Sequence, residues 1–289
     1  CDDSLDGGKG RDYLSGGPGH DTYIYRQGYG TDTILDSEGM NTIEIYGYTA
    51  SAVQAFRTDW NDMTLVMDGS GEAGLQDDSA DKIVLEGFFL SEAYRNFYLS
   101  FEGAVISAAA AGSPLRTLYG TTGSDFMTGF DDGGITLYGG EGDDTLSGTR
   151  ACDHLSGGNG DDRISGGAGD DVINGGSGND VLEGGEGNDT YLFDPGSGTD
   201  ILNDSQGVNV LYFGEGFDWR TIKVRRQDWN DLAVTFADME DTIILRGYFV
   251  SEKYRRFCLV FADGSRFEWD AAENPLLQFF LAEVSEGTE

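Results

Sequence analysis

Between Gly139 and Leu192 the apolar positions of the chain recur with a period of nine residues. Six consecutive phrases read GGEGDDTLS, GTRACDHLS, GGNGDDRIS, GGAGDDVIN, GGSGNDVLE and GGEGNDTYL. In every phrase position one is glycine, position six is aspartate and position eight is apolar. A fixed period with fixed chemistry at each position predicts a repeat architecture.

The nine positions predict a turn followed by a very short strand. The glycine-rich positions one to six can adopt positive φ angles at no steric cost, so the backbone can curl tightly. Positions seven to nine can pair as a strand whose alternation points the apolar eighth residue inward. Stacked phrases then wind a solenoid, and two phrases, or 18 residues, would complete one coil with a strand on each side. We therefore predict an all-β fold, a parallel β-roll solenoid.

In such a roll the position-six aspartates lie in rows along the two turn edges, about 4.8 Å from one coil to the next. Carboxylates at that spacing repel each other unless a cation lies between them. Hard oxygen ligands suit Ca²⁺, with its roughly 6–8 oxygens and flexible geometry, better than Mg²⁺. Zinc prefers His and Cys, and these phrases contain only His154 and Cys152. The alternative, a flexible Gly/Asp linker, gives no reason for the fixed residues at positions six and eight.

Further copies of the phrase lie at the start of the chain and before Gly139. GGKGRDYLS and GGPGHDTYI place Asp12 and Asp21 at position six, and the looser GYGTDTI places Asp32 in a last half-turn. GTTGSDFMT places Asp125 at position six, but the following GFDDGGITLY is one residue too long and has no aspartate there. We expect a bulged coil without a regular ion site at that turn.

The phrase GGxGxDxUx resembles the nonapeptide of the RTX (repeat-in-toxin) family, whose repeats form a calcium-bound parallel β-roll. The resemblance implies that carbonyl oxygens of the first four positions and position-six carboxylates of adjacent turns share each ion. GTRACDHLS departs from the pattern, with Thr149 and Ala151 where glycines belong. The implied metal ligands are Asp12, Asp21, Asp125, Gly139, Gly142, Asp144, Asp153, Gly157, Gly160, Asp162, Gly166, Gly169, Asp171, Gly175, Gly178, Asp180, Gly184, Gly187 and Asp189, with Gly7, Gly10, Gly16, Gly19, Asp32 and Asp200 as further candidates.

Outside the repeats the nine-residue period is lost and strand-like runs appear. Apolar and β-branched residues at 42–47, 63–67, 82–90 and 97–101 predict antiparallel strands. The later half repeats these events, because DWNDMTLV matches DWNDLAVT and DKIVLEGFF matches DTIILRGYF. We therefore expect a tandem duplication divided into 1–34 (end of a first calcium roll), 35–115 (strand-rich capping block), 116–202 (second calcium roll), 203–270 (second capping block) and 271–289 (tail).

A solenoid exposes an apolar end and unpaired strand edges, so each roll needs a terminal cap. Trp60 and Trp229, with Tyr94 and Tyr254, would supply the apolar surface of the caps. The alternative is that paired aromatic side chains form a ligand groove, as in a glycan-binding adhesin module. The blocks resemble the haemolysin-type calcium-binding related segments that follow RTX rolls.

Charge narrows the set of partners. The 52 acidic and 18 basic side chains give a net charge of −34, so the compact chain would repel itself without counter-ions. Nucleic acid and anionic membrane surfaces are unfavourable partners for such a chain. The content of 38 % apolar and 12 % aromatic residues suffices for a core. No apolar run reaches the length of a membrane span, no N-terminal signal peptide is visible, and three cysteines without CxxC spacing predict neither a disulfide framework nor a zinc site.

Catalytic motifs are missing from the sequence. GxSxG, HExxH and a phosphate-binding loop are absent, and two histidines leave little for acid–base chemistry. We expect that the chain is not an enzyme and that it is a piece of a longer protein. Some RTX relatives cleave themselves at Asp-Pro when calcium binds, which makes Asp194-Pro195 a candidate; its alignment with a turn of the first copy favours a turn instead.

The expected mechanism is calcium-coupled folding, in which metal-binding free energy contributes to folding because the site does not exist in the unfolded chain. Extracellular sites are tuned to about 10⁻⁴–10⁻³ M calcium. The resemblance implies a secreted, extracellular module that type I secretion machinery exports unfolded and that supports export, folding and target-cell engagement of a larger toxin or exoprotein. An adhesin module that binds a host cell-surface receptor or glycan is the main alternative, and self-processing is the third. For the tail, docking as a helix and a C-terminal export signal both stay open.

Overall fold

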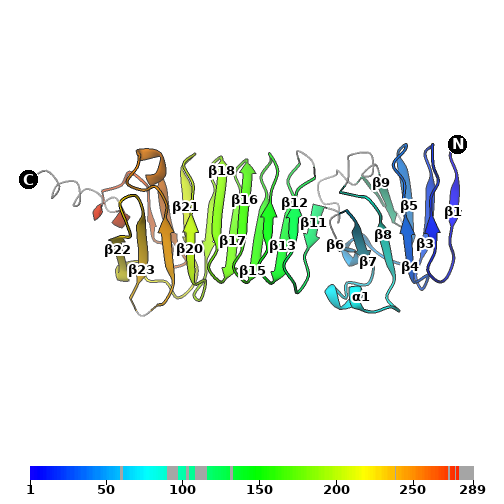
Figure 1. Cartoon of the computed structure of the whole chain (residues 1–289), viewed down its shortest axis with the longest axis horizontal. Coiled ribbons are helices and arrows are strands. Elements are labelled where there is room, and N and C mark those ends of the chain that lie inside the picture. Colours follow the sequence, from blue (N-terminus) through cyan, green and yellow to red (C-terminus); the bar gives the residue numbers. More distant parts are fainter. Residues whose placement is uncertain are drawn as a thin grey trace, which may run out of the picture. The chain divides into compact units, whose positions relative to one another are not determined.

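The computed structural model describes residues 1–58, 61–89, 97–101, 104–107, 116–130, 133–237, 239–272, 274–276 and 278–279. The chain divides into two compact units, Cys1–Thr121 and Thr122–Glu289. In each unit short strands wind into a roll, and the strands of a capping block follow (Figure 1). The fold is therefore the predicted all-β parallel β-roll with strand-rich blocks, in tandem duplication.

Two rows of parallel strands form the roll of the second unit. One row consists of β12 (Phe126–Thr128), β14 (Thr145–Ser147), β16 (Arg163–Ala168), β18 (Val181–Glu186) and β20 (Thr199–Leu202). The other consists of β13 (Thr136–Glu141), β15 (His154–Asn159), β17 (Val172–Ser177), β19 (Thr190–Phe193) and β21 (Asn209–Phe213). Partners are 18 residues apart in the regular coils, as in Thr136 with His154 and Thr145 with Arg163. Two phrases thus complete one coil, as the sequence predicted.

The strands are longer than the sequence pattern predicted. β15 covers positions seven to nine of one phrase and positions one to three of the next, and its register with β17 continues through Gly158 and Gly176. The turn therefore shrinks to positions four to six. Glycine at position two makes this possible, because a Cβ on Gly176 (φ +103°) would lie 1.9 Å from the carbonyl oxygen of Gly158. Only glycine allows the two backbones to approach so closely.

The position-eight side chains form the core of the roll. They stack in the interior with at most 2 % of their surface exposed, so each coil covers the apolar residues of its neighbours. The prediction that position eight points inward is confirmed. The stacked residues are Leu146, Leu155, Ile164, Ile173, Leu182 and Tyr191.

The long phrase GFDDGGITLY shifts the register by one residue. Phe126 pairs with Thr145, 19 residues away, whereas regular partners are 18 residues apart. Ile135 takes the place of a position-six aspartate, since its N–H donates to Asp153 Oδ1 at 2.7 Å. Residues 131–132 of this phrase lie outside the described residues. The extra residue thus gives an apolar side chain where a regular coil has a carboxylate.

The capping block of the second unit adds one parallel strand to each row of the roll and then antiparallel strands. β24 (Thr242–Leu245) pairs parallel with β20 and antiparallel with β23 (Leu232–Phe236), which pairs with β22 (Ile222–Arg226). β25 (Phe257–Phe261) pairs parallel with β21 and antiparallel with β26 (Arg266–Phe267). Two 3₁₀ turns, η4 (Trp219–Thr221) and η5 (Glu252–Arg255), connect these strands. The last strands of the roll are therefore covered rather than left as open edges.

Phenylalanines, and not Trp229, fill the interior of this block. Phe213 stacks on Phe193 and Phe261 with ring centroids 5.8 and 4.9 Å apart, and it also contacts Phe236. Trp229 is 86 % exposed in the turn between β22 and β23. The prediction that Trp229 caps the roll is therefore wrong, because the hairpin carries its turn beyond the packed sheet.

The remaining predicted cap aromatics have different outcomes. The Tyr254 ring lies against Gly247, where a Cβ would come within 3.0 Å of it, which agrees with a packing role. Trp60 and Tyr94 lie outside the described residues.

The first unit repeats this plan with fewer coils. One sheet has the order β1 (Ser4–Asp6), β3 (Thr22–Arg26), β5 (Asn41–Tyr46), β9 (Phe97–Phe101) and β10 (Ala104–Ser107). The other has the order β2 (Tyr13–Leu14), β4 (Thr31–Ile34), β8 (Lys82–Leu85), β7 (Met63–Val66), β6 (Gln54–Arg57) and β11 (Thr117–Tyr119), with the 3₁₀ turn η1 (Ala50–Ala52) before β6.

Strand direction in this first block differs in part from the prediction. β7 is antiparallel to both β6 and β8, as predicted. β8 also pairs parallel with β4. β5 and β9, predicted to be antiparallel strands, run parallel to β3 and β5 respectively, and β9 is also antiparallel to β10, as predicted. The reason is that the coil of the roll continues through them instead of ending before them.

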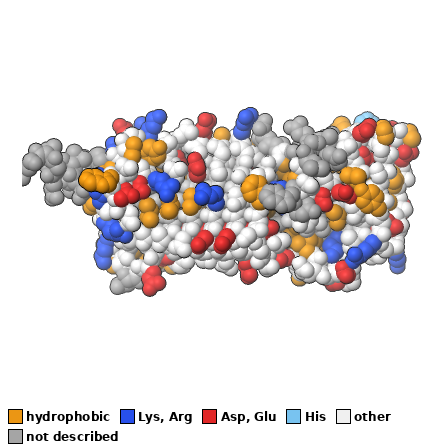
Figure 2. Space-filling model, viewed as in Figure 1, with side chains coloured by type: hydrophobic (Ala, Val, Ile, Leu, Met, Phe, Trp, Pro, Cys, Tyr) orange, Lys and Arg blue, Asp and Glu red, His pale blue; other side chains and the backbone are white. Residues whose placement is uncertain are grey.

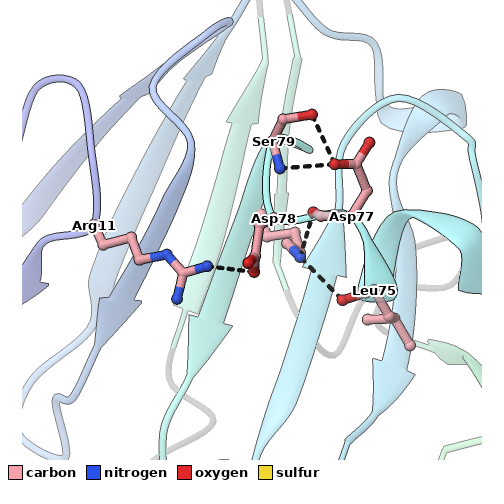
Figure 3. A network of polar contacts seen from close by, with 6 residues as sticks. Arg11, Leu75, Asp77, Asp78 and Ser79 are labelled. Atoms are coloured by element: carbon pink, nitrogen blue, oxygen red, sulfur yellow. Dashed lines mark hydrogen bonds and ion pairs between the residues drawn. The ribbon is translucent and has the colours of Figure 1, made fainter.

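A short helix, α1 (Glu72–Gln76), lies between β7 and β8. Lys82 Nζ donates to the carbonyl oxygens of Leu75 (3.1 Å) and Asp77 (2.8 Å), and Asp78 forms an ion pair with Arg11 (Figure 3). Asp77 Oδ1 accepts hydrogen bonds from the N–H and the hydroxyl of Ser79. The exposed Arg11–Asp78 ion pair joins this loop to the first phrase of this unit's roll.

The beginning of the tail packs on the second block. Leu276 is 1 % exposed, and Asn274 Nδ2 donates to the carbonyl oxygen of Phe257 at 3.2 Å. The tail 271–289 was predicted as a docked helix or an export signal, and its residues 273, 277 and 280–289 lie outside the described residues. The five-part division of the chain stays a prediction; the coil register continues through β5 and β21, beyond residues 34 and 202. Among the described residues, no helix has the length and apolarity needed to cross a membrane.

Candidate metal sites along the turns

The position-six aspartates of the six consecutive phrases are buried, and their carboxylates accept hydrogen bonds from one another's backbones along the roll. The N–H of Asp162 donates to Asp180 Oδ1 at 2.8 Å, and the N–H of Asp171 donates to Asp189 Oδ1 at 2.9 Å. The same contact joins Asp125 to Asp144, Asp144 to Asp162 and Asp153 to Asp171 at 2.7 to 2.8 Å. One carboxylate oxygen of each aspartate is thus committed to the preceding coil, which fixes the side chain.

The second oxygen, Oδ2, has no hydrogen-bond partner at most of these turns. It is buried and unpartnered in Asp144, Asp162, Asp171, Asp180 and Asp189, and in Asp12, Asp21 and Asp32 of the first unit. An unpartnered buried polar group carries a desolvation cost, and a charged one carries a larger cost. The roll therefore holds a row of oxygen donors that need a cation or a proton.

Position-one glycine makes room for this oxygen. A Cβ on Gly157 would lie 2.0 Å from Asp162 Oδ2, and a Cβ on Gly166 would lie 2.2 Å from Asp171 Oδ2. The same holds, at 2.1 to 2.2 Å, for Gly139, Gly175 and Gly184 with the aspartates of their own phrases. Any side chain at position one would occupy the space in front of the carboxylate.

Position-four glycines bring further oxygen donors to the turns. Gly142, Gly160, Gly169, Gly178 and Gly187 all have φ between +102° and +142°, and a Cβ on Gly160 would lie 2.2 Å from the carbonyl oxygen of Gly142. No group of three or more His, Cys, Asp or Glu side chains comes together among the described residues, so an ion here would take backbone carbonyls as well as carboxylates. Such a donor set of hard oxygens fits Ca²⁺.

Burial makes these carboxyl groups weak acids in the absence of a cation. Burial raises the pKa of Asp162, Asp171 and Asp200 to about 7, against the opposing effect of the backbone hydrogen bonds. The pKa is raised to about 6 for Asp32, Asp144, Asp180 and Asp189, with burial again the largest cause. The ionised row is therefore unfavourable in the folded chain at neutral pH unless it is neutralised.

The irregular phrase satisfies its aspartate within the protein. Asp153 Oδ2 accepts hydrogen bonds from the N–H of Thr149 (2.5 Å) and from its hydroxyl (3.0 Å). Thr149 stands where other phrases have the second glycine. Asp153 is buried like its neighbours, but both of its oxygens already have protein partners.

The predicted sites at the ends of the arrays are less uniform. Asp125 is half-buried. Asp200 Oδ1 accepts from the N–H of Asp180 at 3.0 Å, and its carboxylate also bonds to the Ser197 side chain. In the first unit Asp21 and Asp32 accept from the N–H groups of Asp3 (2.7 Å) and Asp12 (3.2 Å). Gly7 and Gly16 face Asp12 and Asp21 as the other position-one glycines do, and Gly10 and Gly19 have positive φ.

A second, exposed ladder at position five was missed from the sequence. Asp143 Oδ1 accepts from the N–H of Asp161, and Asp161 Oδ1 accepts from the N–H of Asn179, at 2.9 and 2.7 Å. Asp170 and Asn188 repeat the contact at 2.7 Å. The signal was available, since position five is Asp or Asn in five of the six phrases.

On the face shown in Figure 2, uncharged side chains and backbone cover most of this roll, which agrees with the burial of the position-six carboxylates.

The parallel β-roll and the oxygen donors at its turns are typical of a calcium-binding repeat protein, and the sequence comparison identifies the repeat. The family model of the RTX calcium-binding nonapeptide repeat matches four copies, at residues 2–31, 136–151 and 156–191. The chain therefore carries RTX calcium-binding repeats. The match includes Asp12, Asp21, Asp144, Asp162 and the later regular turns, and it leaves out residues 152–155 of the irregular phrase.

No curated protein matches the chain. A similar solved structure is the extracellular lipase LipA from Serratia marcescens, with 22 % identity, 88 % of this chain and 38 % of that chain covered, and a TM-score of 0.30. The chain thus spans 38 % of the length of that lipase, and a likeness at this TM-score supports no inference about fold or activity.

We expect that a conservative change at Asp171 weakens calcium-dependent folding more than the same change at Asp153. Asp171→Asn removes charge from an oxygen without a partner, whereas Asp153→Asn alters a carboxylate that Thr149 already satisfies. Both residues are at most 1 % exposed, so they are matched for burial. The measurement is the calcium concentration at the midpoint of folding, and equal midpoints for the two variants would contradict this assignment.

Acidification should partly replace calcium in stabilising the folded roll. The carboxyl groups with a folded pKa of about 6 to 7 bind protons in the folded chain at pH values where an unfolded Asp, with a pKa of about 3.9, has lost them. The contribution of these protonated groups to the stability of the calcium-free roll is therefore fully present below about pH 4 and is lost as pH rises through about 6 to 7. Calcium-stripped protein should gain β structure in far-UV circular dichroism between about pH 8 and pH 5, with salt added to screen exposed charges. Loss of structure on this acidification would contradict the prediction.

Proposed function

We propose that this chain is a calcium-binding module that folds when calcium occupies its turns, after type I export, and so supports export, folding and target-cell engagement of a larger toxin or exoprotein. The observation that carries the proposal is the row of buried Oδ2 atoms without partners, as in Asp162 and Asp171. Each such oxygen disfavours the folded state while it is charged and uncompensated. Folding and cation binding are thereby coupled.

The charge of the whole chain strengthens this coupling. A net charge of −34 opposes compaction, and the rows of position-six residues bring part of that charge to spacings of one coil. At low free calcium the chain would stay unfolded, which suits passage through a narrow secretion channel. Outside the cell, at calcium concentrations of about 10⁻³ M, sites of the extracellular class are filled and the rolls fold against their blocks.

Calcium should therefore act as a folding ligand, and magnesium should not replace it. We expect a cooperative gain of β structure in a far-UV circular dichroism titration with Ca²⁺, and a much weaker response to Mg²⁺, which demands a stricter octahedron and retains its waters. The midpoint of the Asp171→Asn variant should move to higher calcium, and Asp153→Asn is its matched control. A chain that is fully folded in chelator at neutral pH would contradict the proposal.

A second candidate function, ligand binding by the capping block, is favoured by Trp229. Its indole is 86 % exposed, and contacts of Arg226 and Asp228 hold the turn that carries it. Arg226 donates to the carbonyl oxygens of Asp228 (3.1 Å) and Trp229 (3.0 Å), and its guanidinium lies 4.1 Å from the centre of the Phe249 ring. Asp228 Oδ1 accepts from the N–H groups of Asn230 and Asp231. A fixed turn that displays an aromatic platform is suited to stacking on a sugar ring of a host glycan.

Replacement of Trp229 separates the two functions. Trp229→Ala should leave the calcium titration unchanged, because the indole is outside the packed block, and should abolish saturable binding on a glycan array if the block is a glycan-binding module. Tyr13→Ala, at a side chain 59 % exposed in the first unit, is the control for general loss of an exposed aromatic. Equal glycan binding by Trp229→Ala and the native chain would rule out this candidate.

Two expectations from the sequence have no structural support. Asp194 and Pro195 form a turn, in which the N–H of Ser197 donates to the carbonyl oxygen of Asp194 at 3.1 Å. Self-processing at this bond stays a prediction, as does the expectation that the chain is not an enzyme.

A further inference from the structure

The nonapeptide frame continues for one more phrase in each unit, with its acid moved. After the last regular phrase comes a looser half-turn, which carries Asp200 in the second unit and Asp32 in the first. Residues 204–212 then read DSQGVNVLY, and residues 36–44 of the first unit read DSEGMNTIE. Counted in the frame of the repeats, position one is Asp204 or Asp36 and position six is Asn209 or Asn41. A regular phrase has glycine at the first place and aspartate at the second.

The structure places these two phrases in the register of the roll. The N–H of Asp189 donates to Asn209 Oδ1 at 2.8 Å, and the N–H of Asp21 donates to Asn41 Oδ1 at 2.9 Å. These are the contacts that position-six aspartates make in the regular coils. Position four also keeps its place, since a Cβ on Gly207 would lie 1.6 Å from the carbonyl oxygen of Gly187.

The position-six asparagines end the row of free carboxylate oxygens. Asn209 Oδ1 accepts from the preceding coil, and its Nδ2 donates to the carbonyl oxygen of Gln206 at 3.0 Å. Asn41 makes the same pair of contacts, with Glu38 as the acceptor at 3.3 Å. Neither amide leaves an unpartnered oxygen for a cation. Without another acid, the last aspartate of the row would face a neutral coil.

The position-one aspartate supplies that acid and is held by a tyrosine. Asp204 is 4 % exposed, and its Oδ2 accepts from the Tyr191 hydroxyl at 2.5 Å while its Oδ1 accepts from the N–H of Gln206 at 3.0 Å. The Tyr191 oxygen in turn accepts from the N–H of Gly184 at 2.6 Å.

The first unit repeats this arrangement with its own residues. The Tyr23 hydroxyl donates to Asp36 Oδ2 at 2.5 Å, and the Tyr23 oxygen accepts from the N–H of Gly16 at 2.8 Å. Asp36 Oδ1 accepts from the N–H of Glu38 at 3.0 Å, as Asp204 Oδ1 does from Gln206. The same side chains thus recur at the same places in both copies of the duplication.

Two buried carboxylate oxygens converge at the end of the second roll. A Cβ placed on Gly184 would lie 2.1 Å from Asp189 Oδ2 and 2.6 Å from Asp204 Oδ2, so both oxygens face the same point. Asp189 is fully buried and its Oδ2 has no partner. In the first unit Asp21 Oδ2 is likewise buried and unpartnered, and it faces Gly16.

We propose that each roll ends in a terminal cation site whose side-chain ligands are Asp189 and Asp204 in the second unit, and Asp21 and Asp36 in the first. The site takes a hard divalent cation, Ca²⁺, between a position-six and a position-one carboxylate of neighbouring coils. Tyr191 and Tyr23 are positioning residues that fix the position-one carboxylate. This inference rests on the proposed calcium-dependent folding and adds to it ligands that the repeat pattern does not contain.

The first test is a count of calcium ions bound per chain, by equilibrium dialysis of the full chain. The double variant Asp36→Asn, Asp204→Asn should bind two ions fewer than the native chain, and each single variant one ion fewer. The matched control is Asp68→Asn, Asp263→Asn, which removes the same charge from exposed turn aspartates that accept from the N–H groups of Ser70 and Ser265. The control should bind the native number.

The outcomes separate this inference from the proposed function. A native count in the Asp36→Asn, Asp204→Asn chain, together with calcium-dependent folding, overturns the terminal sites alone and indicates a proton shared by each carboxyl pair. A native chain that binds no calcium overturns the proposed function and the terminal sites together.

A milder variant keeps the test decisive if the double variant does not fold. Tyr191→Phe retains both carboxylates and removes only the hydroxyl that holds Asp204. Loss of a partner that orients a metal ligand lowers metal affinity by about 10-fold or more. Luminescence of bound Tb³⁺, used as a calcium substitute, should therefore show one ion of weaker affinity and an unchanged total. Affinities identical to those of the native chain would overturn the role of Asp204 as a ligand.

Discussion

The rest of this structure depends on the position-six carboxylate, which recurs along the roll with only one of its two oxygens hydrogen-bonded. At each regular turn Oδ1 of the position-six aspartate accepts a backbone N–H of the preceding coil, and Oδ2 is buried with no partner. The first contact makes the aspartate part of the architecture, because it joins each coil to the preceding one in register. The second makes the architecture conditional, because a buried charge must be neutralised by a cation or a proton.

The other features of the repeat follow from this requirement. Position-one glycine leaves the space in front of Oδ2, and position-two glycine lets neighbouring strands pair through the turn, as Gly158 and Gly176 do. The position-eight side chains supply the apolar core that holds the coils together. Antiparallel strands then end the parallel stack and cover the last coil. Two irregular turns meet the requirement without a cation. Thr149 donates hydrogen bonds to Asp153, and Ile135 replaces the aspartate altogether.

Much of this arrangement could be predicted from the sequence, because it depends on period. A repeat of nine with aspartate at six and an apolar residue at eight predicted the coil length, the buried Ile173 and Leu182, and the rows of carboxylates. Strand length could not be predicted, since glycine ordinarily weakens a strand, whereas here close pairing of coils requires it. The exposure of Trp229 depends on how far a hairpin extends beyond its sheet, and the hydrogen bonds of Asp153 depend on one threonine side chain. The terminal phrase was missed because its acid stands at position one, where the repeat pattern requires glycine.

Hydrogen exchange at the position-six amides tests the central claim most directly. The N–H groups of Asp162 and Asp171 donate to carboxylates of the next coil, so their protection reports whether the row is assembled. The account predicts strong protection of these amides in calcium and exchange at the rate of an unfolded chain in chelator at neutral pH. Equal protection in calcium and in chelator would contradict it, because the row would then be stable without a cation.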